Sequence, residues 1–138
     1  VTGPGATSLA SDELIEAIQL PKSGANVGDA YLRFIPRTEM DIAVVGCAVN
    51  ITIDQDKCIN ARVALGAVAP TALNITKASD ILINSNLDEE TINKAAKACE
   101  EACNPIDDKR GTIAYRKKVS GVLFKRALKI AIERAKKE

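Results

Sequence analysis

Residues 42–53 read Ile-Ala-Val-Val-Gly-Cys-Ala-Val-Asn-Ile-Thr-Ile, and this stretch decides the expected fold. Every second residue from Ala43 to Ile53 is small or apolar, while the intervening positions become polar from Asn50 onward. Side chains of a strand alternate between its two faces. The pattern therefore predicts a strand with one buried face, whose other face emerges into solvent towards its end.

A return strand is expected after residues 54–57, which read Asp-Gln-Asp-Lys and favour a turn. Its apolar face comprises Ile59, Ala61, Val63, Leu65 and Ala67. Asn60 and Arg62 occupy the opposite face. The two strands together predict an antiparallel hairpin, because each has one face for a shared core.

The chain before this hairpin is less regular. Residues 12–20 predict a short element of either type, because helical and alternating patterns both fit. Residues 22–29 favour a loop, and Tyr31 to Ile35 predicts a third strand. Pro36 would end that strand at a sheet edge or a bulge.

The chain after Pro70 is expected to be helical. A short helix would start at Thr76, and a second would follow Leu87 or Asp88. A long third helix is expected within residues 110–137. Its apolar face would comprise Val119, Val122, Leu123, Phe124, Ala127, Leu128, Ile130 and Ala131. The fold class is α+β: a small antiparallel sheet of three to four strands packed against three C-terminal helices.

Composition excludes several functions. The chain of 138 residues has a net charge of +1 and no histidine, so the commonest general base and metal ligand is absent. We expect no catalytic residue and no metal site. No apolar run approaches the roughly 20 residues of a membrane helix. The start lacks the features of a signal peptide, and the four cysteines suggest reduced thiols, so a cytoplasmic location is expected.

The last helix is rich in lysine and arginine, which suits either a solvated face or a nucleic-acid surface. Only Phe124 interrupts the basic residues, so we expect a solvated face and no nucleic acid as a partner. Near the start of this helix, Arg110 and Arg116 could pair with Asp107, with Asp108 or with the cluster of Glu39 and Asp41. Such pairs would tie the helix to the sheet.

Four segments of the chain occur in an order that is typical of one protein family. They are Thr7-Ser-Leu-Ala-Ser-Asp-Glu-Leu-Ile15 with Leu20-Pro21, Tyr31-Leu-Arg-Phe-Ile-Pro-Arg-Thr-Glu-Met-Asp-Ile-Ala43, Ala61-Arg-Val-Ala-Leu-Gly-Ala-Val-Ala-Pro-Thr71 and Asp108-Lys-Arg-Gly-Thr-Ile-Ala-Tyr-Arg116. This ordered set resembles the C-terminal portion of the FAD-binding (medium) subunit of molybdenum hydroxylases, the family of xanthine dehydrogenase and aerobic carbon monoxide dehydrogenase.

The resemblance implies the same α+β fold and a role in an FAD-dependent oxidoreductase. In this family FAD relays electrons from a 2Fe-2S subunit to an acceptor, and a third subunit holds the molybdenum cofactor. Residues 1–28 would be the tail of the FAD-binding domain and a linker, and residues 29–138 the C-terminal domain. The chain would need an N-terminal FAD-binding segment, would join a hetero-oligomer and would be inactive alone. The alternative is a non-catalytic module for subunit docking.

The resemblance also implies residue roles. Ile15 matches an apolar position that lines the isoalloxazine ring. Arg33 matches a position that is often lysine, where a cation would stabilise negative charge on the reduced ring. Arg37, Glu39 and Asp41 match a charged loop close to the flavin. A salt-bridged entry to the hairpin explains these three residues equally well, so both interpretations stay open.

Overall fold

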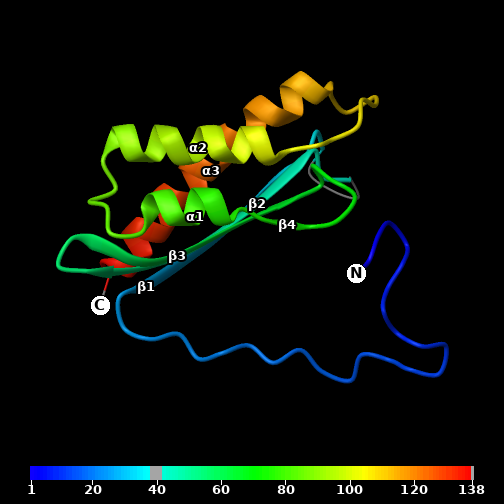
Figure 1. The fold of residues 1–138 in the computed structure, drawn as a ribbon, viewed down its shortest axis with the longest axis horizontal. Helices are drawn as coiled ribbons and strands as arrows, with labels where there is room; N and C mark the ends of the chain where they lie inside the picture. Colours follow the sequence, from blue (N-terminus) through cyan, green and yellow to red (C-terminus); the bar gives the residue numbers. More distant parts are fainter. Residues whose placement is uncertain (38–41, 138) are drawn as a thin grey trace.

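The computed structural model describes residues 1–37 and 42–137. They form an antiparallel sheet of four strands in the order β1-β2-β3-β4, with three helices against one face (Figure 1). The elements are β1 (Val27–Phe34), β2 (Val45–Asp54), β3 (Lys57–Gly66), β4 (Leu73–Asn74), α1 (Thr76–Leu82), α2 (Glu89–Ala102) and α3 (Ile113–Ala135). The predicted fold class is therefore confirmed.

The β2–β3 hairpin confirms the alternating pattern, except at Ile59 and at Ala67, which lies beyond the end of β3 and is exposed. Val49 opposes Val63 in the buried layer. A register shift at Thr52/Ile53 then places Ile53 opposite Cys58. Cys58 is consequently fully buried, whereas Ile59 is 50% exposed. The prediction that Ile59 belongs to the buried face is thus wrong, because the bulge removes it from the alternation.

Strand β1 begins earlier than expected. The loop predicted for residues 22–29 ends before Val27, and the strand ends at Phe34, two residues before Pro36. Gly28, near the start of β1, lies where α3 crosses the strand very closely. A β-carbon at Gly28 would overlap the carbonyl oxygen of Ala131 and lie 2.6 Å from the nitrogen of Ala135. The glycine therefore sets the close approach of strand and helix.

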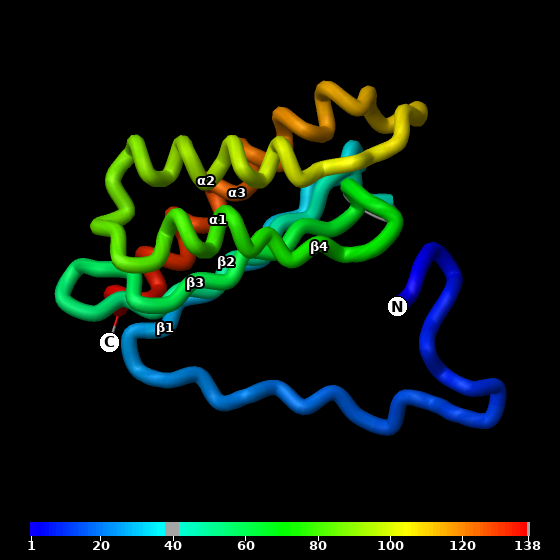
Figure 2. Tube along the Cα trace, in the orientation of Figure 1, coloured from blue at the N-terminus to red at the C-terminus, as the bar shows by residue number. Residues whose placement is uncertain are grey.

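The segment before β1 contains neither a helix nor a strand, so the short element predicted for residues 12–20 is wrong. The segment runs below the sheet and apart from it in the tube view (Figure 2). Leu14, Ile18 and Leu20 are all exposed. These apolar side chains have no partner within the described residues, and regular structure in a short segment depends on such packing.

Helix α3 packs on β1 and β2, while α1 packs on β3 and α2 lies against both of these helices. The side chains of Phe124, Ala127 and Leu128 are fully buried there. Val122 was predicted to share this face but is 42% exposed, because it lies outside the narrower arc that contacts the sheet. Thr112 caps the helix by accepting a hydrogen bond from the Tyr115 main-chain nitrogen.

Helix α2 begins as predicted, directly after Asp88. The Asp88 carboxylate accepts a hydrogen bond from the main-chain nitrogen of Thr91 at 2.9 Å, and this bond lowers the pKa of Asp88. Over residues 1–37 and 42–137, none of the helices is both long and apolar enough to cross a bilayer.

Candidate functional site

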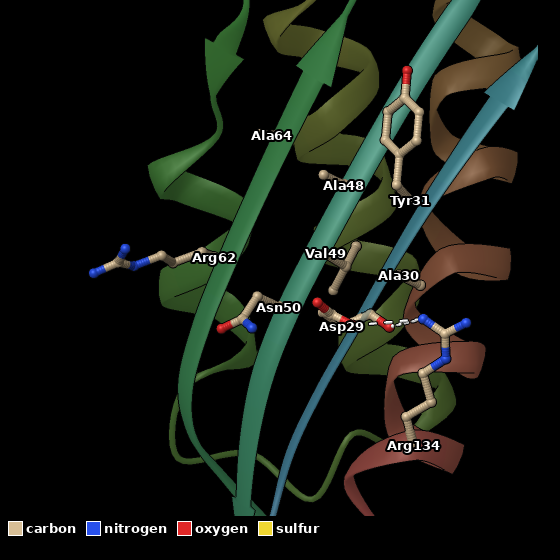
Figure 3. A pocket seen from close by; sticks show the side chains of 9 residues that line it. All are labelled: Asp29, Ala30, Tyr31, Ala48, Val49, Asn50, Arg62, Ala64 and Arg134. Carbon is tan, nitrogen blue, oxygen red and sulfur yellow. Dashed lines mark hydrogen bonds and ion pairs between the residues drawn. The ribbon is translucent and has the colours of Figure 1, made fainter. Parts of the chain in front are cut away.

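The sheet face opposite the helices carries a shallow hollow of ≈ 520 Å³ (Figure 3). Ala48 of β2 and Ala64 of β3 lie directly opposite each other and contribute only methyl groups to it. Tyr31 of β1 and Asn50 of β2 stand on this open face, while the Arg62 side chain points away from the centre. The hollow therefore combines a flat floor with one aromatic ring and polar groups.

The position of the Tyr31 ring depends on a glycine. A β-carbon at Gly46 would lie 2.9 Å from the Tyr31 hydroxyl oxygen, so the missing side chain makes room for the ring. Tyr31 still keeps 63% of its surface exposed. One face of the ring thus packs on the sheet, and the rest of the ring remains accessible to a ligand or to another protein.

A contact from α3 closes one end of the hollow. Arg134 donates a hydrogen bond to the main-chain oxygen of Asp29 at 2.7 Å and approaches its carboxylate at 3.5 Å (Figure 3). Both side chains are largely exposed, so the ion pair contributes little stability. Its effect is positional, since it joins the last turns of α3 to β1.

The structure places the residues suggested by the family resemblance in different settings. Arg33 is exposed on β1 directly opposite Gly46, on the same face as Tyr31. Ile15 lies in the irregular N-terminal segment and is 67% exposed. Arg37 is exposed just after β1. Glu39 and Asp41 lie outside the described residues. Among those of these residues that the structure describes, Arg33 alone lies on the open face of the sheet.

Sequence reasoning did not assign a site role to Tyr31, Asn50, Arg62 or Arg134. The available signal was the pairing of small residues across the hairpin: Gly46 with Gly66, and Ala48 with Ala64. Two facing runs of small residues on a face without covering helices mark a surface that can approach a flat partner closely.

A buried arginine fixes the strands beside this face. Arg116 is only 3% exposed and donates hydrogen bonds to the main-chain oxygens of Val44 at 3.0 Å and Ala67 at 3.4 Å. Its guanidinium also binds the Asp108 carboxylate at 2.6 Å. Hydrogen bonding from the Arg110 main-chain nitrogen, and then from Arg116, lowers the pKa of Asp108. The predicted bracket between the last helix and the sheet is confirmed.

Three of the cysteines gather between the sheet and the helices. Cys47, Cys99 and Cys103 are all buried and free. Burial raises the pKa of Cys47 to about 12 and also raises the pKa of Cys99 and Cys103, so these thiols stay protonated and poorly nucleophilic. Cys103 donates a hydrogen bond to the Ser120 hydroxyl at 3.3 Å. Among the described residues, no group of three or more potential ligands is arranged to hold a metal ion.

Comparison with known proteins gives a consistent result. Residues 30–131 match the family model of the CO dehydrogenase flavoprotein C-terminal domain. The carbon monoxide dehydrogenase medium chain of Afipia carboxidovorans is 35% identical over 130 residues, covering 94% of this chain and 45% of that protein. The xanthine dehydrogenase FAD-binding subunit of Escherichia coli O157:H7 is 27% identical, covering 97% of this chain and 46% of that subunit.

Solved structures of the same family have the same fold as this chain. Carbon monoxide dehydrogenase from Hydrogenophaga pseudoflava superposes with a TM-score of 0.92 and 34% identity, covering 96% of this chain and 46% of that chain. This chain thus spans about half the length of the relatives that it matches. The four-stranded sheet, the three helices on one face and the match over residues 30–131 agree in placing the chain in the family of CO dehydrogenase flavoprotein C-terminal domains.

Proposed function

We propose that this chain is the C-terminal part of the FAD subunit of a molybdenum hydroxylase-type oxidoreductase. The observation that carries the proposal is the family match over residues 30–131, together with an open sheet face that carries Arg33. The relatives named as carbon monoxide dehydrogenase medium chain and xanthine dehydrogenase FAD-binding subunit support the cofactor.

The residues present fit one wall of a flavin site. Ala48 and Ala64 leave the sheet flat enough for a planar ring system to approach. Tyr31 offers an aromatic surface for contact with such a ring. Within residues 1–37 and 42–137, no helix begins with a glycine-rich loop that could hold the phosphates. The adenine and diphosphate end of FAD would then be held by the N-terminal FAD-binding segment that the family resemblance implies.

Arg33 has the clearest electrostatic role in this proposal. FAD, when bound, would relay electrons from a 2Fe-2S subunit to an acceptor, while a molybdenum subunit holds the substrate-oxidising centre. A fixed guanidinium near the ring favours the form with more negative charge. Arg33 would hold that charge in place, while Ile15 and the loop residues Arg37, Glu39 and Asp41 would complete the surroundings of the ring.

The proposal also covers the domain organisation of the chain and the location of the complex in the cell. Residues 1–28 would belong to the tail of the FAD-binding domain, and residues 29–138 would form the C-terminal domain. The complex would be a cytoplasmic hetero-oligomer, and this chain alone would have no oxidoreductase activity. The exposed Leu14, Ile18 and Leu20 support this organisation, because they offer apolar surface to a preceding domain.

Co-expression tests the proposal. The 138-residue chain is produced together with the N-terminal part of the Afipia carboxidovorans medium chain, and the complex is purified. We expect a yellow complex with about one FAD per heterodimer, whereas the chain alone should bind FAD weakly in a titration. A folded but colourless complex, or tight stoichiometric binding by the chain alone, would contradict the assignment.

Substitution of Arg33 separates the flavin role from the alternative of a docking module without chemistry. In the FAD-bearing complex, Arg33→Leu should lower the flavin reduction potential, because the reduced ring loses a nearby cation, while Arg33→Lys should largely preserve it. Spectroelectrochemical titration gives the potential, and gel filtration gives assembly. Loss of assembly with an unchanged potential in the remaining complex would favour the docking module.

A further inference from the structure

The outer edge of β1 is an unprotected strand edge. In the part of the chain that the structure describes, β1 pairs with β2 only, so it ends the sheet on the side of α3 (Figure 3). An edge strand presents a row of unpaired main-chain N–H and C=O groups, which proteins commonly shield with proline, lysine or a bulge. Residues 30–34 read Ala-Tyr-Leu-Arg-Phe and contain none of these.

One contact shows which main-chain groups face outward. The Asp29 oxygen accepts its hydrogen bond from Arg134 of α3, so it points away from β2. Alternate residues of a strand in an antiparallel pair point the same way. The N–H and C=O groups of Tyr31 and Arg33 therefore also face the outer edge, beyond the position that Arg134 occupies.

An apolar groove follows this edge. We call it the edge groove: a hollow of ≈ 540 Å³ between β1 and α3, with a floor made by Leu32, Phe34, Leu123 and Ile130. Leu32, Phe34 and Ile130 are only partly buried, although they pack against the core. A strand edge beside a groove bounded by a helix is the arrangement in which peptides bind by strand addition.

The rim of the edge groove is mostly positive. Arg126 and Lys129 of α3 and Arg33 of β1 line it, against the single acidic residue Glu133. Among the described residues, no ion pair within 4 Å neutralises these cations. The groove therefore favours an occupant that combines apolar side chains with carboxylates.

We propose that the edge groove binds an extended segment of a partner protein, which adds as a fifth strand to β1 and carries both apolar and acidic residues at the alternate positions that face α3. The apolar side chains of the segment contact Leu32, Phe34 and Ile130, and its carboxylates face Arg126 and Lys129. A second copy of this chain fits less well, because its β1 carries Asp29 as its single acidic residue and so offers no excess of carboxylates to the positive rim. This inference is independent of the FAD assignment.

Synthetic peptides test the proposal on the 138-residue chain. The first is (Glu-Thr-Val-Thr)2, in which Glu and Val share one face of a strand, the second is (Lys-Thr-Val-Thr)2, and the third is the first peptide with alternate amides N-methylated. Fluorescence anisotropy should show binding of the first peptide only, because the second has the wrong charge and the third lacks main-chain donors. Hydrogen exchange at the amides of Tyr31 and Arg33 should slow when the first peptide binds.

Charge reversal supplies a matched control. The double variant R126E/K129E should weaken binding of (Glu-Thr-Val-Thr)2 about tenfold or more. The variant K57E/K97E changes the net charge equally at exposed sites outside the groove and should retain binding. Circular dichroism confirms that both variants are folded. Equal binding of the N-methylated peptide, equal losses in both double variants, or self-association of the chain through β1 would overturn the proposal.

Discussion

The two faces of one sheet differ in kind. The face towards the helices carries Val49, Val63 and Leu65, all almost fully buried. The opposite face carries Ala48 and Ala64, with Arg62 exposed beside them. Because the same strands supply both faces, backbone pairing cannot account for the difference. The helical face provides stability, and the open face is left free for a partner, so substitutions on the two faces should have separable effects.

The largest effect is expected at the centre of the helical face. Phe124→Ala should lower the free energy of unfolding by about 4 kcal/mol, because it removes a fully buried ring and leaves a cavity. Urea denaturation followed by circular dichroism measures the change. Val122→Ala on the same helix is the control and should cost less than about 0.5 kcal/mol, since Val122 is exposed. Equal losses would show that α3 is not oriented as described.

The next effect concerns the bracket that joins the layers. Arg116→Leu should cost about 3 kcal/mol, because it leaves the main-chain oxygens of Val44 and Ala67 without this donor and removes one of the donors to the Asp108 carboxylate. The same denaturation measurement applies. Arg110→Leu is the comparison and should cost less, because Arg110 is more exposed. A neutral Arg116→Leu would mean that the strand ends are held by other contacts.

Adjacent residues of β3 compare the two faces directly. Val63→Ala should cost about 2 kcal/mol, because Val63 is fully buried. Arg62→Ala should change stability by less than about 0.5 kcal/mol, because its side chain is exposed. Both variants are measured side by side in urea. Similar losses at the two positions would remove the distinction between a stabilising face and an open face.

The smallest effect is a pH dependence. The pKa of Asp108 is lowered in the folded chain, so its stabilising contribution is present above the pKa of unfolded aspartate, about 3.9, and is lost as pH falls through the folded value. The stability difference between the wild type and Asp108→Asn should therefore shrink between pH 6 and pH 3. A difference that grows on acidification would contradict the lowered pKa. Urea titrations at several pH values measure it.

Sequence patterns predicted the parts of the fold that depend on local periodicity. The β2–β3 hairpin, the Asp88 cap and the three helices follow from alternation, turn residues and helix spacing. The bulge that exposes Ile59 was missed, because a register shift depends on the partner strand. The irregular segment before β1 was misjudged, because its apolar residues have no partner among the described residues.

The site was less predictable than the fold. The resemblance selected Arg33, which the structure places on the open face, but only strand register brings Tyr31 over Gly46 and opposes Ala48 to Ala64. The acceptors of Arg116 are main-chain oxygens remote in sequence, so no side-chain pattern could identify them. The roles of Ile15, Arg33, Arg37, Glu39 and Asp41 stay predictions.

Gly28 also matters for anyone who randomises this protein. A mutational library would find the open face permissive, whereas position 28 admits one residue in twenty, because even alanine would push α3 away from β1. That displacement would also separate Arg134 from Asp29 and widen the edge groove. A single methyl group on the far side of the sheet would thus alter two surfaces that it never touches, and variants at Gly28 should not be used to assign function to either surface.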